Sequence, residues 1–474
     1  MAAITEKQLF ELLEPFRQTH LLRFWKSLTA SQQENLAQQI SSVEWAKTVG
    51  WVKAALQNEN LPIAFDQLQP APYTPLEPAT AADKGYQATC RERGQNLLKG
   101  GKLAGFTVAG GQGTRLGYDG PKGTFAFTAL RKATLFQFFA ESILRYQEKF
   151  SCALPWYIMT SPANDQATRK FFTKQKYFGL SPDNLMFFTQ GTLPAFDLEG
   201  KAILSAPDSL ALSANGHGGS FAALKDSGAL EDMQRRGVSI LSYWQVDNPL
   251  VKLFDPLFIG MHDLTGSEMS SRALIKRDPM EKLGHFCRLD KRTIIVEYSD
   301  MPEKLLYETD ASGMLRYRAG SPAIHLLSCE FIQRLTNGSL DFQPHRALKK
   351  VPFVDDSGLE QNPSQPNAIK LEFFLFDALP LAKNPLIFAA DRREQFAPIK
   401  NASGADSAES CRAALLERCA NWFDRAGKSF PRKSDGSPDA IVEISPRRCV
   451  DTEDFLEQHT FLPAVSRGKS LLLD

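Results

Sequence analysis

The sequence predicts an α/β fold built on a mostly parallel mixed sheet, and three observations lead to that class. Between about residues 100 and 246, short apolar runs of strand length alternate with longer amphipathic stretches of helix length, which is the pattern of βαβ units. The chain has 474 residues, 43% of them apolar, enough for the buried cores of two or three domains. A glycine-rich loop directly follows the first apolar run, and parallel sheets bind ligands at the carboxyl ends of their strands.

Residues 1–80 predict a helical N-terminal region followed by a proline-rich linker. Thr5 and Gln8 have the spacing of a capping box, and Ser31 with Glu34 repeats that spacing before a second apolar face. The apolar face of the first predicted helix consists of Leu9, Leu12, Leu13 and Phe16. Five prolines between residues 62 and 78 exclude a regular element, so we expect extended chain there and a domain boundary near residue 80.

Residues 81–384 predict the main α/β domain, and residues 385–474 predict a small α+β domain. After a polar helix that ends at residues 100–101, the predicted elements are strand 103–109, helix from 134, strand 156–159, helix 165–177, strand 185–189, helix 221–235 and strand 238–246. Residues 270–298 have the pattern of inserted antiparallel hairpins, and an apolar helix is expected around residues 373–374. The last part predicts strand 386–389, helix 407–425 and strands 441–444 and 471–473.

Charge and composition exclude several classes of protein. Lys and Arg total 55 and Asp and Glu total 54, a formal charge of +1 that argues against a nucleic-acid binder. The most apolar stretch, residues 371–382, contains two carboxylates and a proline, so we expect neither a membrane-spanning helix nor a membrane partner. Acidic residues near the N-terminus argue against a signal peptide, and seven scattered cysteines without a C-x-x-C pair indicate reduced thiols. We therefore expect a cytoplasmic protein.

The segment from Ala109 to Gly123 carries the strongest chemical signal in the sequence. Glycines at positions 110, 111, 113 and 117 let backbone N–H groups approach phosphate oxygens closely, and Arg115 and Lys122 follow as two cations. Two better-known phosphate motifs do not match. A Walker loop requires glycine directly before its lysine, where Pro121 stands, and the dinucleotide fingerprint requires glycine where Leu116 stands.

This segment resembles the signature loop of the UDP-sugar pyrophosphorylases, and more narrowly that of the UDP-N-acetylhexosamine pyrophosphorylases. Further matches follow in order along most of the chain, at residues 20–25, 190–194, 243–248, 296–299, 369–376, 398–402 and 443–446. The resemblance implies a Rossmann-like, GT-A-like fold of the nucleotide-diphospho-sugar transferase type. It also implies a reaction in which UTP and a sugar 1-phosphate give UDP-sugar and pyrophosphate with Mg²⁺, for which Mn²⁺ could substitute. Monomer and homodimer both stay open.

The resemblance assigns roles to individual positions of this sequence. Arg115, Lys122 and Lys400 would contact the phosphates as catalytic cations, and Gln190 with Gly216 would recognise the uracil edge. The positions assigned to the nucleotide are Val108, Ala109, Gly110, Gly111, Gly113, Thr114, Gln190, Gly216, Asp247 and Lys370. The positions assigned to the sugar are His217, Glu297, Tyr298, Ser321, Phe374 and Phe376.

Three of these residues have structural alternatives. Asp247 ends the strand predicted at 238–246, where a carboxylate can bind Mg²⁺ or can cap the next helix; Asp255, before a proline, is the better candidate for a cap. Lys370 could place its aliphatic stem along the predicted apolar helix instead of binding nucleotide. Lys400 lies in a loop, where an exposed lysine is usually only solvated.

Two positions depart from the N-acetylhexosamine pattern. His217 replaces a sugar-contacting asparagine, in a Gly-His-Gly sequence that resembles the UDP-glucose branch, and Ser321 replaces a second such asparagine. Because the flanking sequences match the N-acetylhexosamine branch throughout, we expect N-acetylglucosamine 1-phosphate as the sugar substrate. The two departures leave glucose 1-phosphate or broad specificity as the alternative.

The sequence argues against two other function classes. A non-catalytic UDP-sugar-binding protein should have lost cations or the metal ligand, which this chain retains. A glycosyltransferase commonly uses a D-x-D metal motif, for which Asp263 and Glu268 offer no counterpart.

Overall fold

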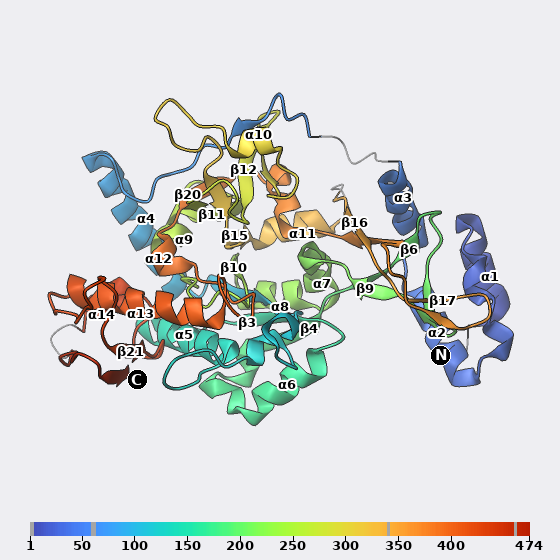
Figure 1. The fold of residues 1–474 in the computed structure, drawn as a ribbon, viewed down its shortest axis with the longest axis horizontal. Coiled ribbons are helices and arrows are strands. Elements are labelled where there is room, and N and C mark those ends of the chain that lie inside the picture. The colour runs from blue at the N-terminus through green and yellow to red at the C-terminus, as the bar shows by residue number, and fades with distance from the viewer. Residues whose placement is uncertain (1–3, 58–62, 339–341, 459–461) are drawn as a thin grey trace. The chain divides into compact units, whose positions relative to one another are not determined.

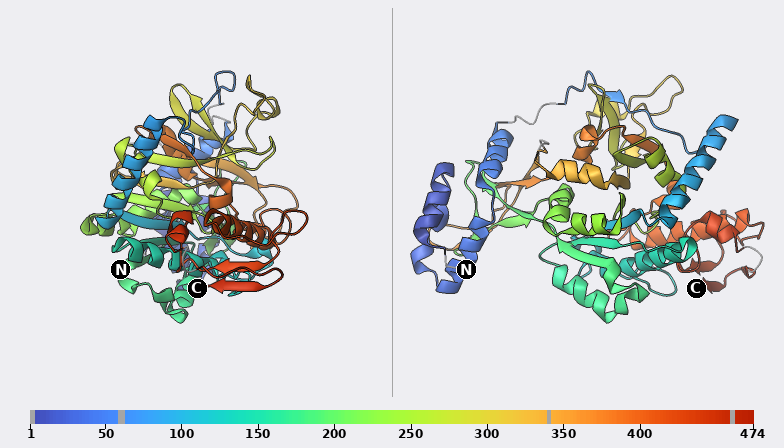
Figure 2. Two further views of the ribbon diagram at one scale, coloured as in Figure 1. Left: turned by 90° about the vertical axis from the view of Figure 1, so that its left-hand side faces the viewer. Right: turned by 180° about the vertical axis from the view of Figure 1, so that it is seen from behind.

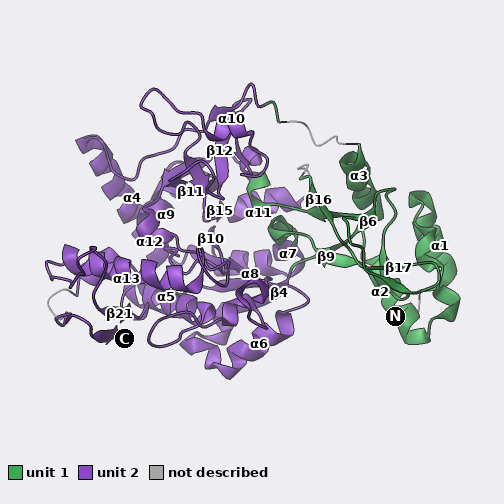
Figure 3. Ribbon diagram, in the orientation of Figure 1, with its two compact units in different colours: residues 1–64, 190–222, 341–377 green, residues 65–189, 223–340, 378–474 purple. Residues whose placement is uncertain are grey.

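The structure is a computed structural model that describes residues 4–57, 63–338, 342–458 and 462–474. The chain forms two compact units, each assembled from three segments that are far apart in sequence (Figure 3). Unit 1 contains residues 1–64, 190–222 and 341–377, and unit 2 contains residues 65–189, 223–340 and 378–474. The division into 1–80, 81–384 and 385–474 by sequence character stays a prediction.

The helices of unit 1 come from the first segment: α1 (Glu6–Leu13), α2 (Ala30–Ser41) and α3 (Trp45–Leu56). The capping box predicted at Thr5 and Gln8 is confirmed. The box predicted at Ser31 and Glu34 is wrong, because Thr29 and Gln32 form it and Ser31 lies inside α2. Thr29 has the extended backbone of an N-cap, and its hydroxyl accepts from the Gln32 N–H.

Small antiparallel sheets complete unit 1. Strand β19 (Ala368–Glu372) lies between β16 (His345–Lys349) and β6 (Phe196–Asp197). The remaining strands pair two by two: β5 (Thr192–Pro194) with β9 (Leu212–Ala214), β7 (Leu204–Ala206) with β8 (Ser209–Leu210), and β17 (Phe353–Val354) with β18 (Glu360–Gln361). Apolar side chains of the helices form one core with β19 residues Ile369 and Leu371.

The apolar helix expected around residues 373–374 is not observed. Lys370 lies within β19, the next two phenylalanines follow the strand without helical structure, and a 3₁₀ helix then spans Leu375–Leu381. Pro380 inside that segment lacks the N–H that an α-helix interior needs. The alternative of a lysine stem along an apolar helix therefore falls away.

Unit 2 is built on a mixed sheet of eleven strands among the described residues, which confirms the predicted fold class (Figure 1). Strands β10, β2, β3 and β4 run parallel, whereas β15, β11, β14, β12, β13 and β1 continue the sheet antiparallel; β20 pairs parallel with β11. Their bounds are β1 (Gln69–Pro70), β2 (Leu103–Val108), β3 (Trp156–Thr160), β4 (Leu185–Thr189), β10 (Ile240–Gln245), β11 (Met269–Ile275), β12 (Gly284–Leu289), β13 (Arg292–Val296), β14 (Ala319–Ser321), β15 (His325–Ser328) and β20 (Leu386–Ala389).

The helices of unit 2 include α4 (Ala81–Lys99), α5 (Leu135–Phe150), α6 (Asp165–Lys174), α8 (Ala229–Arg236), α9 (Pro256–Leu264), α11 (Cys329–Thr336) and α13 (Ala408–Arg425). The single helix predicted at 221–235 is wrong, since α7 (Ser220–Asp226) ends before Gly228 and α8 begins after it. Gly228 has a φ of +78°, a left-handed conformation that breaks a helix and that glycine adopts without penalty.

Helices α4 and α9 pack unusually closely, side by side in Figures 1 and 2. A Cβ added to Gly94 would lie 1.9 Å from the Pro256 carbonyl oxygen, and one added to Gly260 would lie 1.7 Å from that of Cys90. Glycine at both positions therefore allows the backbones to touch. This contact fixes the start of α9, where Asp255 caps the helix as predicted.

The C-terminal part of unit 2 adds β20 to the main sheet and forms a second core. In that core α13 packs with the parallel pair β21 (Ile441–Ile444) and β22 (Ser470–Leu473), and with α14 (Thr452–Leu456). All seven cysteines are unpaired in the structure, as expected. Within the described residues, every helix is too short or too polar to cross a lipid bilayer.

Candidate active site

The predicted phosphate-binding loop begins at the carboxyl end of β2, between two parallel neighbours. Val108, the last residue of β2, pairs with Gln245 of β10 on one side and with Met159 of β3 on the other. The chain after β10 continues to Asp247, and the chain after β3 continues to Ser161. Three segments with polar side chains therefore follow adjacent strands at one edge of the sheet, where a ligand is expected.

The loop itself offers free amides. Among the residues that the structure describes, the N–H groups of Gly110, Gly111 and Gln112 donate to no acceptor. Gly111 is exposed, and a Cβ built on it meets nothing within 4 Å. Gly113 differs, because a Cβ there would lie 2.6 Å from the Tyr118 ring, so its role is in packing. Three successive free amides beside open space fit an anionic ligand.

The cations follow the loop. Thr114 and Arg115 begin an exposed 3₁₀ turn (Thr114–Leu116). Lys122 starts a second turn (Lys122–Thr124), and its N–H donates to the Gly111 carbonyl at 3.0 Å. Gly123 is required there, since a Cβ would lie 2.2 Å from the Phe136 ring. The loop and the lysine are thus linked through the backbone.

Lys122 and Asp247 face each other. The Lys122 Nζ lies 3.9 Å from Asp247 Oδ2, and the two side chains are only 17% and 13% exposed. Burial lowers the pKa of Lys122, the Asp247 carboxylate raises it, and the positive charges of Lys400 and Arg115 lower it further. The structure therefore brings Arg115, Lys122, Asp247 and Lys400 into one electrostatic cluster, as the sequence predicts.

Backbone hydrogen bonds hold Lys400 near Asp247. The Ile399 N–H donates to the Asp247 carbonyl at 2.8 Å. The Asn248 side chain donates to the Gln395 carbonyl at 2.8 Å and accepts from the Ala397 N–H at 3.1 Å. None of the helices in the described ranges has Asp247 as its N-cap, so the capping alternative is not observed. Asp255 instead caps α9 and pairs with Arg272.

The donor set at Asp247 suits a magnesium ion that is bound mainly by substrate. Within the described part of the chain, no group of three or more His, Cys, Asp or Glu side chains could hold a metal. Mg²⁺ is commonly bound by one or two carboxylates together with substrate phosphates and water, and Asp247 supplies one largely buried carboxylate beside the loop. The residues present therefore fit such an ion.

The residues of unit 2 that were assigned to the sugar lie around Gly284. Gly284 pairs with Ser321 across β12 and β14, and a Cβ on Gly284 would lie 3.3 Å from Glu297 Oε1. Tyr298 follows Glu297 and is 39% exposed. The structure therefore brings Ser321 and Glu297 to one place on the antiparallel part of the sheet.

The other assigned residues belong to unit 1. His217 stacks on Phe374, with ring centroids 5.4 Å apart, and lies 5.9 Å from the Phe376 ring. Its Nδ1 accepts from the Leu375 N–H at 3.1 Å, so its Nε2 carries the hydrogen in the neutral ring. Burial, and to a lesser extent His345, lowers the pKa of His217 to about 4, which keeps it neutral near pH 7.

Gln190, Gly216 and Lys370 are also in unit 1. Gln190 is buried, Gly216 has a φ of +82°, and Lys370 of β19 pairs with Ala347 of β16. A Cβ on Gly216 would lie 2.4 Å from the Phe373 carbonyl oxygen, so glycine is required there for backbone packing.

The sequence reasoning missed two residues at the loop. Ser161 and Asn164 follow β3, and their side chains donate to carbonyl groups of the glycine-rich loop. The signal was a Ser and an Asn directly after a predicted strand, which also fits an ordinary helix start.

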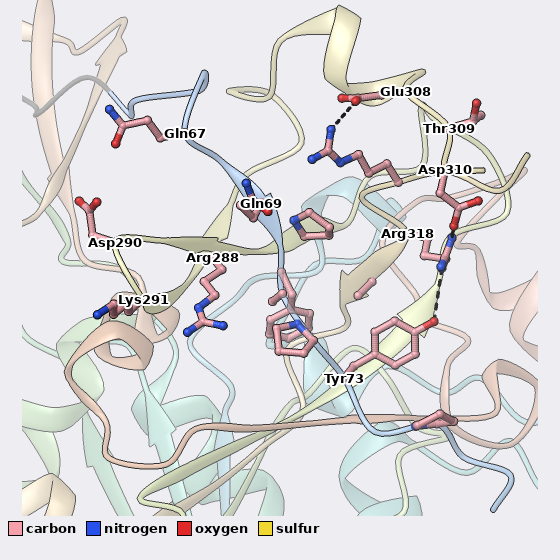
Figure 4. A pocket seen from close by; sticks show the side chains of 17 residues that line it. Gln67, Gln69, Tyr73, Arg288, Asp290, Lys291, Glu308, Thr309, Asp310 and Arg318 are labelled. Carbon is pink, nitrogen blue, oxygen red and sulfur yellow. Dashed lines mark hydrogen bonds and ion pairs between the residues drawn. The ribbon is translucent and has the colours of Figure 1, made fainter. Parts of the chain in front are cut away.

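A cavity of about 1030 Å³ lies elsewhere in unit 2 (Figure 4). Its walls are β1, the far end of the β12–β13 hairpin and residues 308–319, and none of the predicted site residues lines it. Figure 4 shows Arg318 between Asp310, at 2.5 Å, and the Tyr73 hydroxyl, at 3.4 Å. The candidate site is therefore the sheet edge and not this cavity.

Comparison with known proteins decides the family. A family profile described as UTP–glucose-1-phosphate uridylyltransferase (UDPGP) matches residues 58–471. The chain belongs to this family. The resemblance read from the signature loop is thereby confirmed, and the UDPGP chain is a nucleotidyltransferase, a uridylyltransferase of UDP-sugar metabolism.

Relatives of this UDPGP chain cover nearly its whole length. UDP-N-acetylhexosamine pyrophosphorylase-like protein 1 of Mus musculus is 36% identical over 475 residues, which cover 93% of this chain and 92% of the mouse protein. UDP-N-acetylglucosamine pyrophosphorylase of Saccharomyces cerevisiae is 34% identical over 447 residues, with coverage of 90% and 92%.

A solved structure has the same fold. The uridine diphosphate N-acetylglucosamine pyrophosphorylase of Trypanosoma brucei superposes with a TM-score of 0.82, covering 100% of this chain and 99% of that one, at 23% identity.

Proposed function

We propose that this UDPGP-family chain transfers the uridylyl group of UTP to N-acetylglucosamine 1-phosphate, giving UDP-N-acetylglucosamine and pyrophosphate. The observation that carries the proposal is the cluster at the sheet edge. Three free amides of residues 110–112 lie in the segment that continues to Arg115 and Lys122. Lys122 in turn interacts electrostatically with Lys400 and with the carboxylate of Asp247. This arrangement suits a polyphosphate and a cation together, which is the ligand that such a reaction needs.

The reaction then requires no protein nucleophile. A sugar phosphate is mostly dianionic at pH 7, because the second pKa of such monoesters is about 6, and its oxygen can attack the α-phosphorus directly. Repulsion between the two anions and the charge that builds on pyrophosphate oppose this attack. Arg115, Lys122 and Lys400 would offset both effects, and Lys122, which is 17% exposed and faces Asp247, is already positioned to do so.

Mg²⁺, held by Asp247 and substrate oxygens, would supply further neutralisation of the polyphosphate charge. The protein's own part is to keep one carboxylate facing Lys122. The carbonyl of Asp247 accepts from Ile399, which keeps this residue beside the segment that carries Lys400.

We also propose the remaining roles from the family resemblance. Gln190, Gly216 and Lys370 would bind the uridine end of the nucleotide, and the sugar would be bound by His217, Glu297, Tyr298, Ser321, Phe374 and Phe376. The neutral His217 ring offers one N–H donor at Nε2, where an asparagine would offer an amide with two donors and an acceptor.

N-acetylglucosamine 1-phosphate is the proposed sugar because both near-full-length relatives above are named for N-acetylhexosamine or N-acetylglucosamine pyrophosphorylases. Glucose 1-phosphate is the second candidate, favoured by the Gly-His-Gly sequence at His217 and by Ser321.

The test is pyrophosphate release from UTP and Mg²⁺ with a panel of sugar 1-phosphates. Release with N-acetylglucosamine 1-phosphate at least tenfold faster than with glucose 1-phosphate is the expected result. The reverse ranking would replace the proposed sugar by glucose, and no release with any sugar would overturn the proposed activity.

A further inference from the structure

We propose that Ser161 and Asn164 are positioning residues for the phosphate-binding loop, which they keep with its amides turned toward the nucleotide. This inference rests on the proposed function and adds two residues that touch neither nucleotide nor metal. They lie in the turn of residues 161–164, between β3 and α6. This segment is called the carbonyl-holding turn below.

The carbonyl-holding turn binds three successive carbonyl groups of the loop. Asn164 Nδ2 donates to the carbonyl of Ala109 at 3.0 Å and to that of Gly111 at 3.3 Å. The Ser161 hydroxyl donates to the carbonyl of Gly110 at 2.8 Å. Both donors are buried, with Asn164 only 1% and Ser161 only 7% exposed. Water therefore competes little for these bonds.

The orientation of the Asn164 amide follows from its partners. The Ser161 N–H points at one end of the carboxamide at 2.9 Å, so that end must be the accepting oxygen. The other end, which faces the two carbonyls, must be the donating NH₂ group. An aspartate at this position would place an acceptor against two acceptors.

Because the peptide unit is planar, fixing the direction of a carbonyl also fixes the direction of the following N–H group. In a trans peptide the C=O of one residue and the N–H of the next point in opposite directions from one rigid plane. Binding the carbonyls of residues 109, 110 and 111 on one side therefore turns the N–H groups of residues 110, 111 and 112 to the other. These three N–H groups find no acceptor among the described residues.

The glycines make this support necessary. Gly110 and Gly111 have no Cβ, so their peptide planes rotate more freely than those of other residues. A rotated plane would present a carbonyl oxygen to the phosphates, which is repulsive. The hydrogen bonds from the carbonyl-holding turn therefore restrain peptide planes that the glycines leave free to rotate.

The Asn164 side chain bonds to the loop carbonyls and does not cap the helix that it precedes. It occupies the N-cap position of α6, where asparagine usually accepts from an amide of the first helical turn, yet its side chain makes no capping bond. A residue present only for the helix would cap it.

The experiment compares Asn164→Asp, Ser161→Ala and Ser161→Thr with the wild-type enzyme. Aspartate keeps the shape of Asn164 and can still accept from the Ser161 N–H, so the turn should be kept. We expect Asn164→Asp to raise the KM for UTP and the Kd for UDP about tenfold or more, because a buried donor becomes a repelling acceptor. The KM for sugar 1-phosphate should change less than twofold. Ser161→Ala should raise the KM for UTP severalfold, and Ser161→Thr, which keeps the hydroxyl, should restore it.

Asn367→Asp is the matched control. Asn367 also bridges backbone groups, accepting from the Val351 N–H at 2.8 Å and donating to its carbonyl at 3.0 Å. That variant should lower the thermal midpoint and leave the KM for UTP unchanged.

An unchanged KM for UTP in both Asn164→Asp and Ser161→Ala, with an active wild-type enzyme, would overturn this inference alone. A wild-type protein that neither binds nor consumes UTP would overturn the proposed function as well.

Discussion

Replacing Asp247 by asparagine removes one charge from the site and leaves its backbone contacts in place. The Asp247 carbonyl still accepts from Ile399, so the fold should be kept. At 3.9 Å from Lys122 Nζ, the carboxylate interacts with that cation by about 1 kcal/mol in a water-like dielectric and by about 4 kcal/mol at an effective dielectric of 20. Because both side chains are less than one-fifth exposed, the pKa of Lys122 should fall further in Asp247→Asn.

The variant should separate turnover from nucleotide binding. We expect turnover with Mg²⁺ to fall about 10²- to 10³-fold, the usual effect of losing one electrostatic contact to the transition state. UTP binding measured by calorimetry with EDTA should stay within about threefold or tighten, because a carboxylate no longer repels the triphosphate. A carboxylate that merely ordered the fold would instead lower both quantities and the thermal midpoint together.

Asp263→Asn is the matched control for the loss of a carboxylate. Asp263 pairs with Arg93 at 2.6 Å on the surface, where such a pair contributes at most about 1 kcal/mol. The turnover of the Asp263→Asn variant and its dependence on Mg²⁺ should match those of the wild-type enzyme. Near-native turnover of Asp247→Asn with Mg²⁺ would refute the assignment of this carboxylate to the metal.

Three further predictions use other residues. Gly111→Ala should keep the thermal midpoint, because its Cβ meets open space, yet weaken UTP binding at least tenfold, and a UTP affinity equal to that of the wild type would refute the ligand position. Gly123→Ala should instead lower the thermal midpoint, because its Cβ meets the Phe136 ring. Burial lowers the pKa of His262 to about 4, so below about pH 6.5 the unfolded state binds a proton that the folded state does not, and the free energy of unfolding should fall by about 3 kcal/mol for this residue between about pH 6.5 and 4. His262→Gln should reduce that fall in denaturant titrations, and an unchanged dependence of the free energy of unfolding on pH would contradict the prediction. His217→Asn should change the ratio of kcat/KM between N-acetylglucosamine 1-phosphate and glucose 1-phosphate more than it changes the KM for UTP; an unchanged ratio would remove His217 from sugar selection.

Much of the candidate phosphate site could be proposed from the sequence because its signals are local. The strand, loop and cations of residues 103–122 are contiguous, and glycines followed by two cations at that spacing fit an anionic ligand. The position of Asp247 was predicted for a similar reason, since a carboxylate that follows an apolar strand of a parallel sheet lies at the edge where such sheets commonly bind ligands.

Other expectations failed where local signals conflict. The predicted helix at 221–235 overlooked Gly228, whose left-handed backbone divides it. The predicted helix around residues 373–374 follows from apolar composition, which does not distinguish a helix from a buried strand and loop over so few residues. Ser31 and Thr29 both had a suitable partner three residues later, and the backbone at Thr29 decided which of them caps α2.

The sequence by itself determined the fold class, the family and the position of the glycine-rich loop after a strand, because each is recorded in the order and spacing of residue types along the chain. Only the tertiary structure decided that residues 1–64, 190–222 and 341–377 form one unit. Only the structure, likewise, placed Lys400 in the same cluster as Lys122 and directed the Asn164 amide to the loop carbonyls. Those facts depend on contacts between residues tens to hundreds of positions apart, and such contacts are set by the packing of a whole core, which no local pattern of residues records.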